Sequence, residues 1–129
     1  MLETAVSSLP KWRLRAAWSL QLGLAIIFAF TASRKFLADP VPVATIEALG
    51  TGQWLRIAIG LAELAGAIGL LVPRFAGVAG FCLALLMLGA AGAHIFMIGG
   101  SPIPALVLFT TSALVAYLRG VRFNSVNNL

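Results

Sequence analysis

Glu63 is a carboxylate in the middle of the apolar run from Leu55 to Val72. The run is about 17–19 residues long, which is enough to cross a lipid bilayer. A charge at that depth costs at least about 2.5–3.5 kcal/mol on insertion scales, so the side chain needs a partner, a proton or a function. Two hypotheses follow. Glu63 either carries a proton or orients a ligand, or it is held by a basic partner or kept protonated by burial.

His94 and Lys35 are the other residues in apolar surroundings that could take part in chemistry. An imidazole can exchange protons or hydrogen-bond the polar head of a ligand. The alternative is a histidine satisfied by Glu63 or by a backbone carbonyl. Lys35 closes an apolar run, and its long side chain can bend inward or extend to the membrane surface. Glu63 and His94 are therefore the candidate catalytic residues, and Lys35, Glu63 and His94 the candidate ligand-binding residues.

A metal or disulfide centre is not predicted. One histidine and one glutamate supply two ligands, whereas metal sites commonly need three or four. A haem held by His94 alone would rest on a single lone histidine, which is a weak signal. Cys82 is the only cysteine, which excludes an internal disulfide and a C-x-x-C redox pair.

The composition is that of a membrane protein with a single domain. Hydrophobic residues make up 60% of the 129 residues and charged residues 10%, and the mean hydropathy is +1.00. A soluble domain of this size needs more charge to cover its surface. The apolar runs predict an all-α, integral membrane four-helix bundle, with spans at about 16–33, 55–72, 76–98 and 103–118.

The remaining segments flank or join these spans. Residues 1–15 form a predicted basic cytoplasmic head, residues 16–119 the membrane domain and residues 120–129 a polar tail. Between the first two spans, Asp39, Pro40 and Pro42 interrupt the helix, and 43–49 can form a short amphipathic helix lying in the interface.

The positive residues favour both termini on the cytoplasmic side, because cytoplasmic loops carry the excess of Lys and Arg. That side would hold Lys11, Arg13, Arg15, Arg74, Arg119 and Arg122. Glu63 and His94 would then lie in the outer half of the bundle, about 12 Å and 6–8 Å below its outer boundary at 1.5 Å per helical residue. Small residues along the second and third spans, including Gly66, Gly89 and Gly92, suggest close helix packing in a compact bundle.

Three motifs resemble the DoxX-like family of small membrane proteins. They are Ala32-Ser33-Arg34-Lys35, the G-x-x-E-x-x-G-x-x-G-L-L-x-P stretch that begins at Gly60, and Ala93-His94. The resemblance runs from about Phe28 to Arg119 and implies a four-helix membrane protein with functional positions at Lys35, Glu63 and His94. Arg34 departs from the family, which has a small residue there.

The family name comes from a subunit of a quinol-linked oxidase or thiosulfate:quinone oxidoreductase, and some relatives are associated with redox partners or with detoxification of phenolic compounds. The resemblance therefore implies a multi-pass protein of the bacterial inner membrane that is accessory to a redox process or binds a quinone-like or phenol-like molecule. Quinone is the one candidate cofactor. The expected partners are the lipid bilayer, a redox protein and further copies of the chain, and nucleic acid is not expected. A membrane enzyme using acid–base chemistry, or a structural or assembly factor, remains an alternative.

Overall fold

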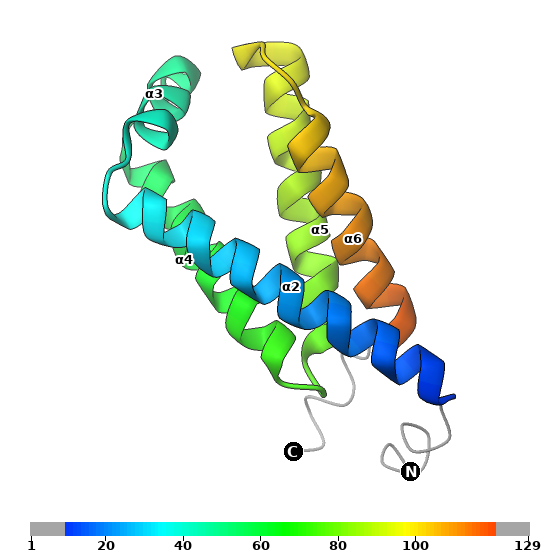
Figure 1. Ribbon diagram of the computed structural model, residues 1–129. Coiled ribbons are helices and arrows are strands. Elements are labelled where there is room, and N and C mark those ends of the chain that lie inside the picture. The colour runs from blue at the N-terminus through cyan, green and yellow to red at the C-terminus, as the bar shows by residue number, and fades with distance from the viewer. Residues whose placement is uncertain (1–9, 121–129) are drawn as a thin grey trace.

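The structure is a computed structural model, and it describes residues 10–120. In this range the chain is entirely helical, with five α-helices and one π-helical turn (Figure 1). In order along the chain they are α2 (Lys11–Phe36), α3 (Pro40–Leu49), α4 (Trp54–Leu71), α5 (Ala76–Ala93), η1 (His94–Ile98) and α6 (Ile103–Arg119). Most of the predicted basic head and all but the first residue of the polar tail lie outside the described residues.

Three helices in the described range are long and apolar enough to cross a membrane, namely α2, α4 and α5 continued by η1. Large apolar side chains point outward on each of them, for example Ile26, Leu61 and Phe96. Such a surface suits lipid, because a soluble protein rarely exposes continuous apolar patches. The chain is therefore a multi-pass membrane protein. At 17 residues, α6 is a shorter apolar helix.

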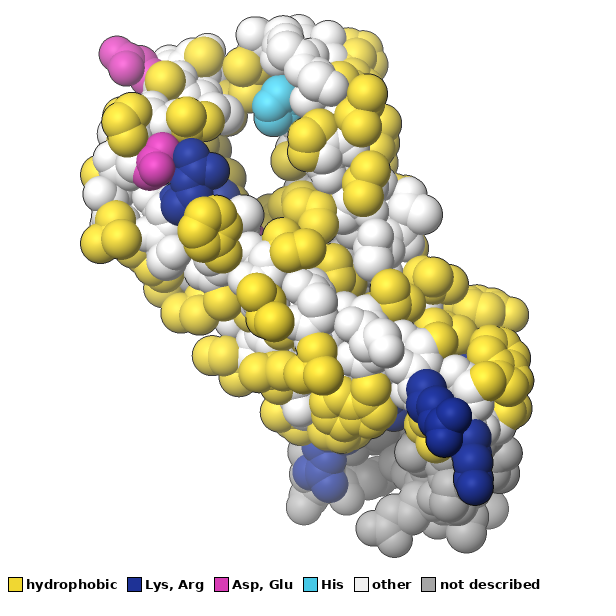
Figure 2. Space-filling view, viewed as in Figure 1, with side chains coloured by type: hydrophobic (Ala, Val, Ile, Leu, Met, Phe, Trp, Pro, Cys, Tyr) yellow, Lys and Arg dark blue, Asp and Glu magenta, His cyan; other side chains and the backbone are white. Residues whose placement is uncertain are grey.

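The long helices form two pairs, α2 with α4 and α5 with α6, whose members lie side by side (Figure 1). The pairs meet at the end that holds the α4–α5 turn and diverge toward the other end. There α3 contacts η1 and connects the two pairs again. In the space-filling view, a hollow is visible between the pairs beneath this contact (Figure 2).

Glycine positions explain where the pairs meet. A Cβ on Gly66 would lie 2.5 Å from the side chain of Leu83, and one on Gly69 would lie 2.9 Å from Cβ of Ala79. These positions therefore bring the backbones of α4 and α5 together. Gly89 and Gly92, further along α5, have nothing within 4 Å. The prediction that these two glycines lie at close helix contacts is therefore wrong.

The short helix α3 is set by local signals at both ends. The Asp39 side chain accepts a hydrogen bond from the amide of Val41, which caps the start of the helix. Pro40 and Pro42 fall in its first turn, where a missing N–H is tolerated. Gly50, at φ 74°, ends it in the left-handed conformation that glycine adopts most easily. The helix thus begins three residues before the predicted amphipathic segment.

Candidate functional site

Glu63 and Lys35 form a buried ion pair between α4 and α2. Nζ of Lys35 lies 3.0 Å from Oε1 and 3.1 Å from Oε2 of Glu63. Thr31 donates its hydroxyl to Oε2 at 3.0 Å. Glu63 is 3% exposed, and the side chain of Lys35 is 18% exposed. The acid that the sequence places inside the membrane is therefore bound by one cation and one hydroxyl from the neighbouring helix.

Helical spacing positions these groups. Thr31 and Lys35 are four residues apart on α2, so they lie one above the other on the face that meets α4. On α4, Gly60 precedes Glu63 by about one turn. A Cβ on Gly60 would lie 3.0 Å from the ring of Phe36 and 3.4 Å from Cβ of Lys35. A glycine here lets α2 come close enough for the lysine to reach the carboxylate.

Arg56 fastens the same end of α2. Its Nη1 donates to the backbone oxygen of Lys35, and its Nε donates to the side chain of Gln53 at 2.9 Å. The last carbonyls of a helix have no partner within the helix and carry partial negative charge. A guanidinium at this position therefore satisfies one such carbonyl and holds α2 against α4, at the residue that also forms the ion pair.

The hydrogen bonds around Glu63 and Lys35 determine what this ion pair can do. The carboxylate of Glu63 accepts three hydrogen bonds, two from Nζ of Lys35 and one from Thr31. Removing one member of a buried pair leaves an uncompensated charge and costs about 3–5 kcal/mol. Bound in this way, Glu63 holds the ammonium group of Lys35 in place. Lys35 has three N–H donors, so it can hydrogen-bond a further polar atom while it holds Glu63.

His94 lies apart from this pair. It begins the π-helical turn η1, and its Nδ1 lies 2.9 Å from the backbone oxygen of Ala90. In the described part of the chain it makes no hydrogen bond or ion pair with Lys35 or Glu63. His94 lies where α5 continues into η1, and so belongs to the other helix pair than Lys35 on α2 and Glu63 on α4. A carbonyl bonded at Nδ1 leaves Nε2 available for a second partner.

The register of α4 and α5 explains this separation. The contact between Gly66 and Leu83 fixes how the two helices slide against each other. Glu63 is one turn, or about 4–5 Å, from that contact, whereas His94 is 11 residues, or about 16 Å, beyond it. The pairs also diverge in that direction (Figure 1). The structure therefore brings together two of the three candidate site residues and leaves the third on the opposite wall.

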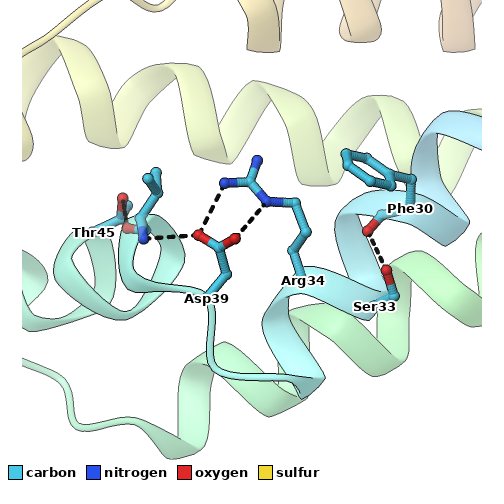
Figure 3. A network of polar contacts seen from close by, with 6 residues as sticks. Phe30, Ser33, Arg34, Asp39 and Thr45 are labelled. Carbon is cyan, nitrogen blue, oxygen red and sulfur yellow. Dashed lines mark hydrogen bonds and ion pairs between the residues drawn. The ribbon is translucent and has the colours of Figure 1, made fainter.

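Arg34, the residue that departs from the family motif, has a specific partner. Its Nη2 lies 2.9 Å from Oδ1 of Asp39 and its Nε 3.2 Å from Oδ2 (Figure 3). Its guanidinium also lies over the ring of Phe30, with Cζ 5.9 Å from the centroid. The hydrogen bond from Arg34, with that from the Val41 amide, lowers the pKa of Asp39 below its ordinary value of 3.8. The fork-shaped pair ties the end of α2 to the start of α3.

A second buried polar network lies at the end where the helix pairs meet. Gln21 is fully buried, donates to the backbone oxygen of Leu70 at 2.7 Å and accepts from Nε of Arg119 at 2.6 Å. Gln21 thus links α2 to both α4 and α6. Its partner Arg119 was missed, because a basic residue at the end of an apolar run is usually a membrane-surface anchor. The sequence signal for this network was Gln21 itself, a polar residue within an apolar span.

The other chemistry-bearing residues do not assemble into a site. No group of three His, Cys, Asp or Glu that could hold a metal ion occurs in residues 10–120. Cys82 is an exposed free thiol. It lines a shallow apolar groove of about 540 Å³ between α4 and α5, together with Ala62, Ala65 and Val78.

Comparison with protein families gives one match. The model of the DoxX-like family matches residues 19–119, which include all the helices but the first turns of α2. No curated protein and no solved structure matches the chain.

Proposed function

Because the chain belongs to the DoxX-like family of membrane proteins, we propose that it binds a lipophilic molecule with a polar head, such as a quinone or a phenol, between its two helix pairs. The protein acts as an accessory to a membrane redox process and does not itself catalyse a reaction. The observation that carries the proposal is the hollow between the pairs (Figure 2), beside the α5–η1 segment that holds His94. A bound molecule would enter sideways from the bilayer.

The polar groups near the hollow match such a ligand. With Nδ1 of His94 at the carbonyl of Ala90, Nε2 is the nitrogen that a quinone or phenol oxygen would meet. Lys35 would contribute a further N–H from the opposite wall, with Glu63 and Thr31 fixing its position. Pockets for small molecules are typically apolar with a few oriented polar groups, which is the arrangement proposed here.

The state of Glu63 argues against the enzyme alternative. General acid–base catalysis needs a group that is free to take up a proton near the reacting atoms. The carboxylate of Glu63 is instead bound by Lys35 and Thr31 and is almost fully buried. A pure assembly factor would bind no ligand in the hollow, so the ligand-binding experiment below distinguishes the two roles.

The proposal includes a topology and a location. All four long helices, α6 included, cross the bacterial inner membrane as a four-helix bundle with both termini in the cytoplasm, and residues 16–119 form this membrane domain. α3 then lies at the outer interface, on the side of Lys35, Glu63 and His94. A redox protein and further copies of the chain are the proposed protein partners. Cysteines introduced at exposed positions of α3 and labelled from one side of intact cells would test the orientation.

Thermal unfolding of the full chain in detergent tests the binding. A ligand at 100 times its dissociation constant stabilises a protein by about 2.7 kcal/mol, which is readily measured as a rise in Tm. We expect a short-chain ubiquinone or 4-nonylphenol to raise Tm, and an alkane of equal length to have no effect. His94→Ala should abolish most of the rise, and Thr110→Ala, on the exposed face of α6, should retain it. An equal response of wild type and His94→Ala would refute the proposed contact.

A further inference from the structure

The end of the molecule opposite the hollow carries only positive charge among the described residues. Lys11 and Arg15 at the start of α2 and Arg74 in the α4–α5 turn form no ion pair in this range. Of the described acidic residues, Asp39 and Glu47 lie at the opposite end with α3, and Glu63 lies in the middle of α4. Figure 2 shows dark-blue basic side chains at this end without magenta acidic ones, whereas the dark-blue group at the opposite end lies beside a magenta carboxylate.

Arg119, at the end of α6, is a further cation at this end of the molecule, and its side chain is held by neighbouring residues. Its Nε donates to Oε1 of the fully buried Gln21, and its Cζ lies 5.3 Å from the centroid of the Trp18 ring. Its Nη2 is buried and has no hydrogen-bond partner among residues 10–120. A guanidinium has five N–H donors, and a buried donor without an acceptor costs free energy. The side chain is thus held in place by two contacts while donors remain unused.

Arg13 brings a second guanidinium to the same place. It donates from Nε to the backbone oxygen of Leu118 at 3.0 Å and from Nη2 to that of Tyr117 at 3.1 Å. Its Cζ lies 5.6 Å from the centroid of the Tyr117 ring. The start of α2 is therefore attached to the end of α6, and two oriented guanidinium groups and two aromatic rings lie where these helices meet.

We propose that this junction of α2 and α6, formed by Arg13, Trp18, Tyr117 and Arg119, binds the phosphate headgroup of an anionic phospholipid. Phosphate oxygens are strong acceptors, and the planar fork of arginine matches them well. Basic pockets between membrane helices bind anionic headgroups, and Trp and Tyr favour the headgroup level of the bilayer. The site lies at the opposite end from the hollow and does not depend on the ligand proposed there.

Binding of single lipids to the full chain tests the site. The protein is incorporated in nanodiscs of phosphatidylcholine alone or with phosphatidylglycerol, and retained lipids are counted by native mass spectrometry. We expect phosphatidylglycerol to be retained in preference to phosphatidylcholine. One Lys or Arg near a membrane surface contributes about 1 kcal/mol, so Arg119→Gln should weaken retention about fivefold.

Arg74→Gln is the matched control, because it removes the same charge from the same end but outside the junction. Retention unchanged in Arg74→Gln and lowered in Arg119→Gln supports the site. An equal loss in both variants would indicate a diffuse surface charge and overturn it, as would equal retention of the two lipids by the wild type. Displacement of the lipid by millimolar inorganic phosphate would show a site for free anions instead. Because Arg119 also binds Gln21, Arg13→Gln provides a second variant, and it too should lower retention.

Discussion

Lys35 contacts both carboxylate oxygens of Glu63, at 3.0 and 3.1 Å, across the interface of α2 and α4. Four residues earlier on the same face of α2, Thr31 binds the same carboxylate. Side chains on two consecutive turns of α2 thus bind the single carboxylate of Glu63 on α4. The pair is the main polar link between these helices near the hollow, and it makes their separation electrostatically costly.

Removal of one charge from this pair is expected to destabilise the protein strongly. Lys35→Met or Glu63→Gln alone should lower the free energy of unfolding by about 3–5 kcal/mol, because an unpaired charge or polar group stays buried. The double variant Lys35→Met/Glu63→Leu should recover much of the loss, since apolar residues often replace a buried pair at little cost. Thermal unfolding in detergent measures this cycle. Glu47→Gln, on the exposed face of α3, is the control and should have little effect; equal effects of Glu47→Gln and Glu63→Gln would contradict the assignment.

Gly60 should be intolerant of a methyl group. The Cβ of Gly60→Ala would lie 3.0 Å from the ring of Phe36, so the end of α2 must shift and the Lys35–Glu63 pair with it. Gly23→Ala is a matched control, because a Cβ there meets nothing within 4 Å. In water-soluble helices such a change gains about 0.5–1 kcal/mol through backbone entropy. We therefore expect Tm to fall for Gly60→Ala and to stay level or rise for Gly23→Ala; the reverse order would exclude the close approach described here.

The sequence predicted the helices well, but it did not predict that the two helix pairs diverge. Long apolar runs predicted α4, α5 with η1, and α6 to within one residue at each end, whereas α2 begins five residues before and ends three residues after its predicted span. A basic partner was one of the two hypotheses for the buried Glu63, and Lys35 fills that place. Divergence of the pairs was not predictable, because Gly66 and Gly89 look alike in the sequence while only Gly66 meets a neighbouring helix. The role of Asp39 was missed for another reason. An aspartate close to two prolines indicates a helix break. The pairing of Asp39 with Arg34 depends on the turn that follows α2, which the sequence pattern does not predict.

The attachment of α3 to α2 is expected to weaken in acid. The pKa of Asp39 is lowered by hydrogen bonds from Arg34 and the Val41 amide. A carboxyl whose folded pKa is depressed stabilises the fold at pH values above its unfolded pKa, and this stability is lost as the pH falls through the folded pKa. Hydrogen exchange of residues 40–49 should therefore accelerate below about pH 4 relative to the rest of the protein. Asp39→Asn should show the faster exchange already at pH 7 and lose the pH dependence; exchange in Asp39→Asn that still responds to acid would assign the effect to another group.

Gln21 should be the most sensitive polar residue at the end where the helix pairs meet. Its amide joins the backbone of Leu70 on α4 to Arg119 on α6, and it is fully buried. Gln21→Leu fills a similar volume but leaves a carbonyl and a guanidinium without their partner, at about 1–3 kcal/mol for each buried group. Gln53→Leu is the comparison, since Gln53 is only partly buried and links α3 with the start of α4. Unfolding monitored by tryptophan fluorescence should show a much larger fall in Tm for Gln21→Leu. If the two variants lost the same stability, the α2–α4–α6 network would contribute no more than a surface hydrogen bond, and contacts such as Gly66 with Leu83 would alone hold the pairs together at that end.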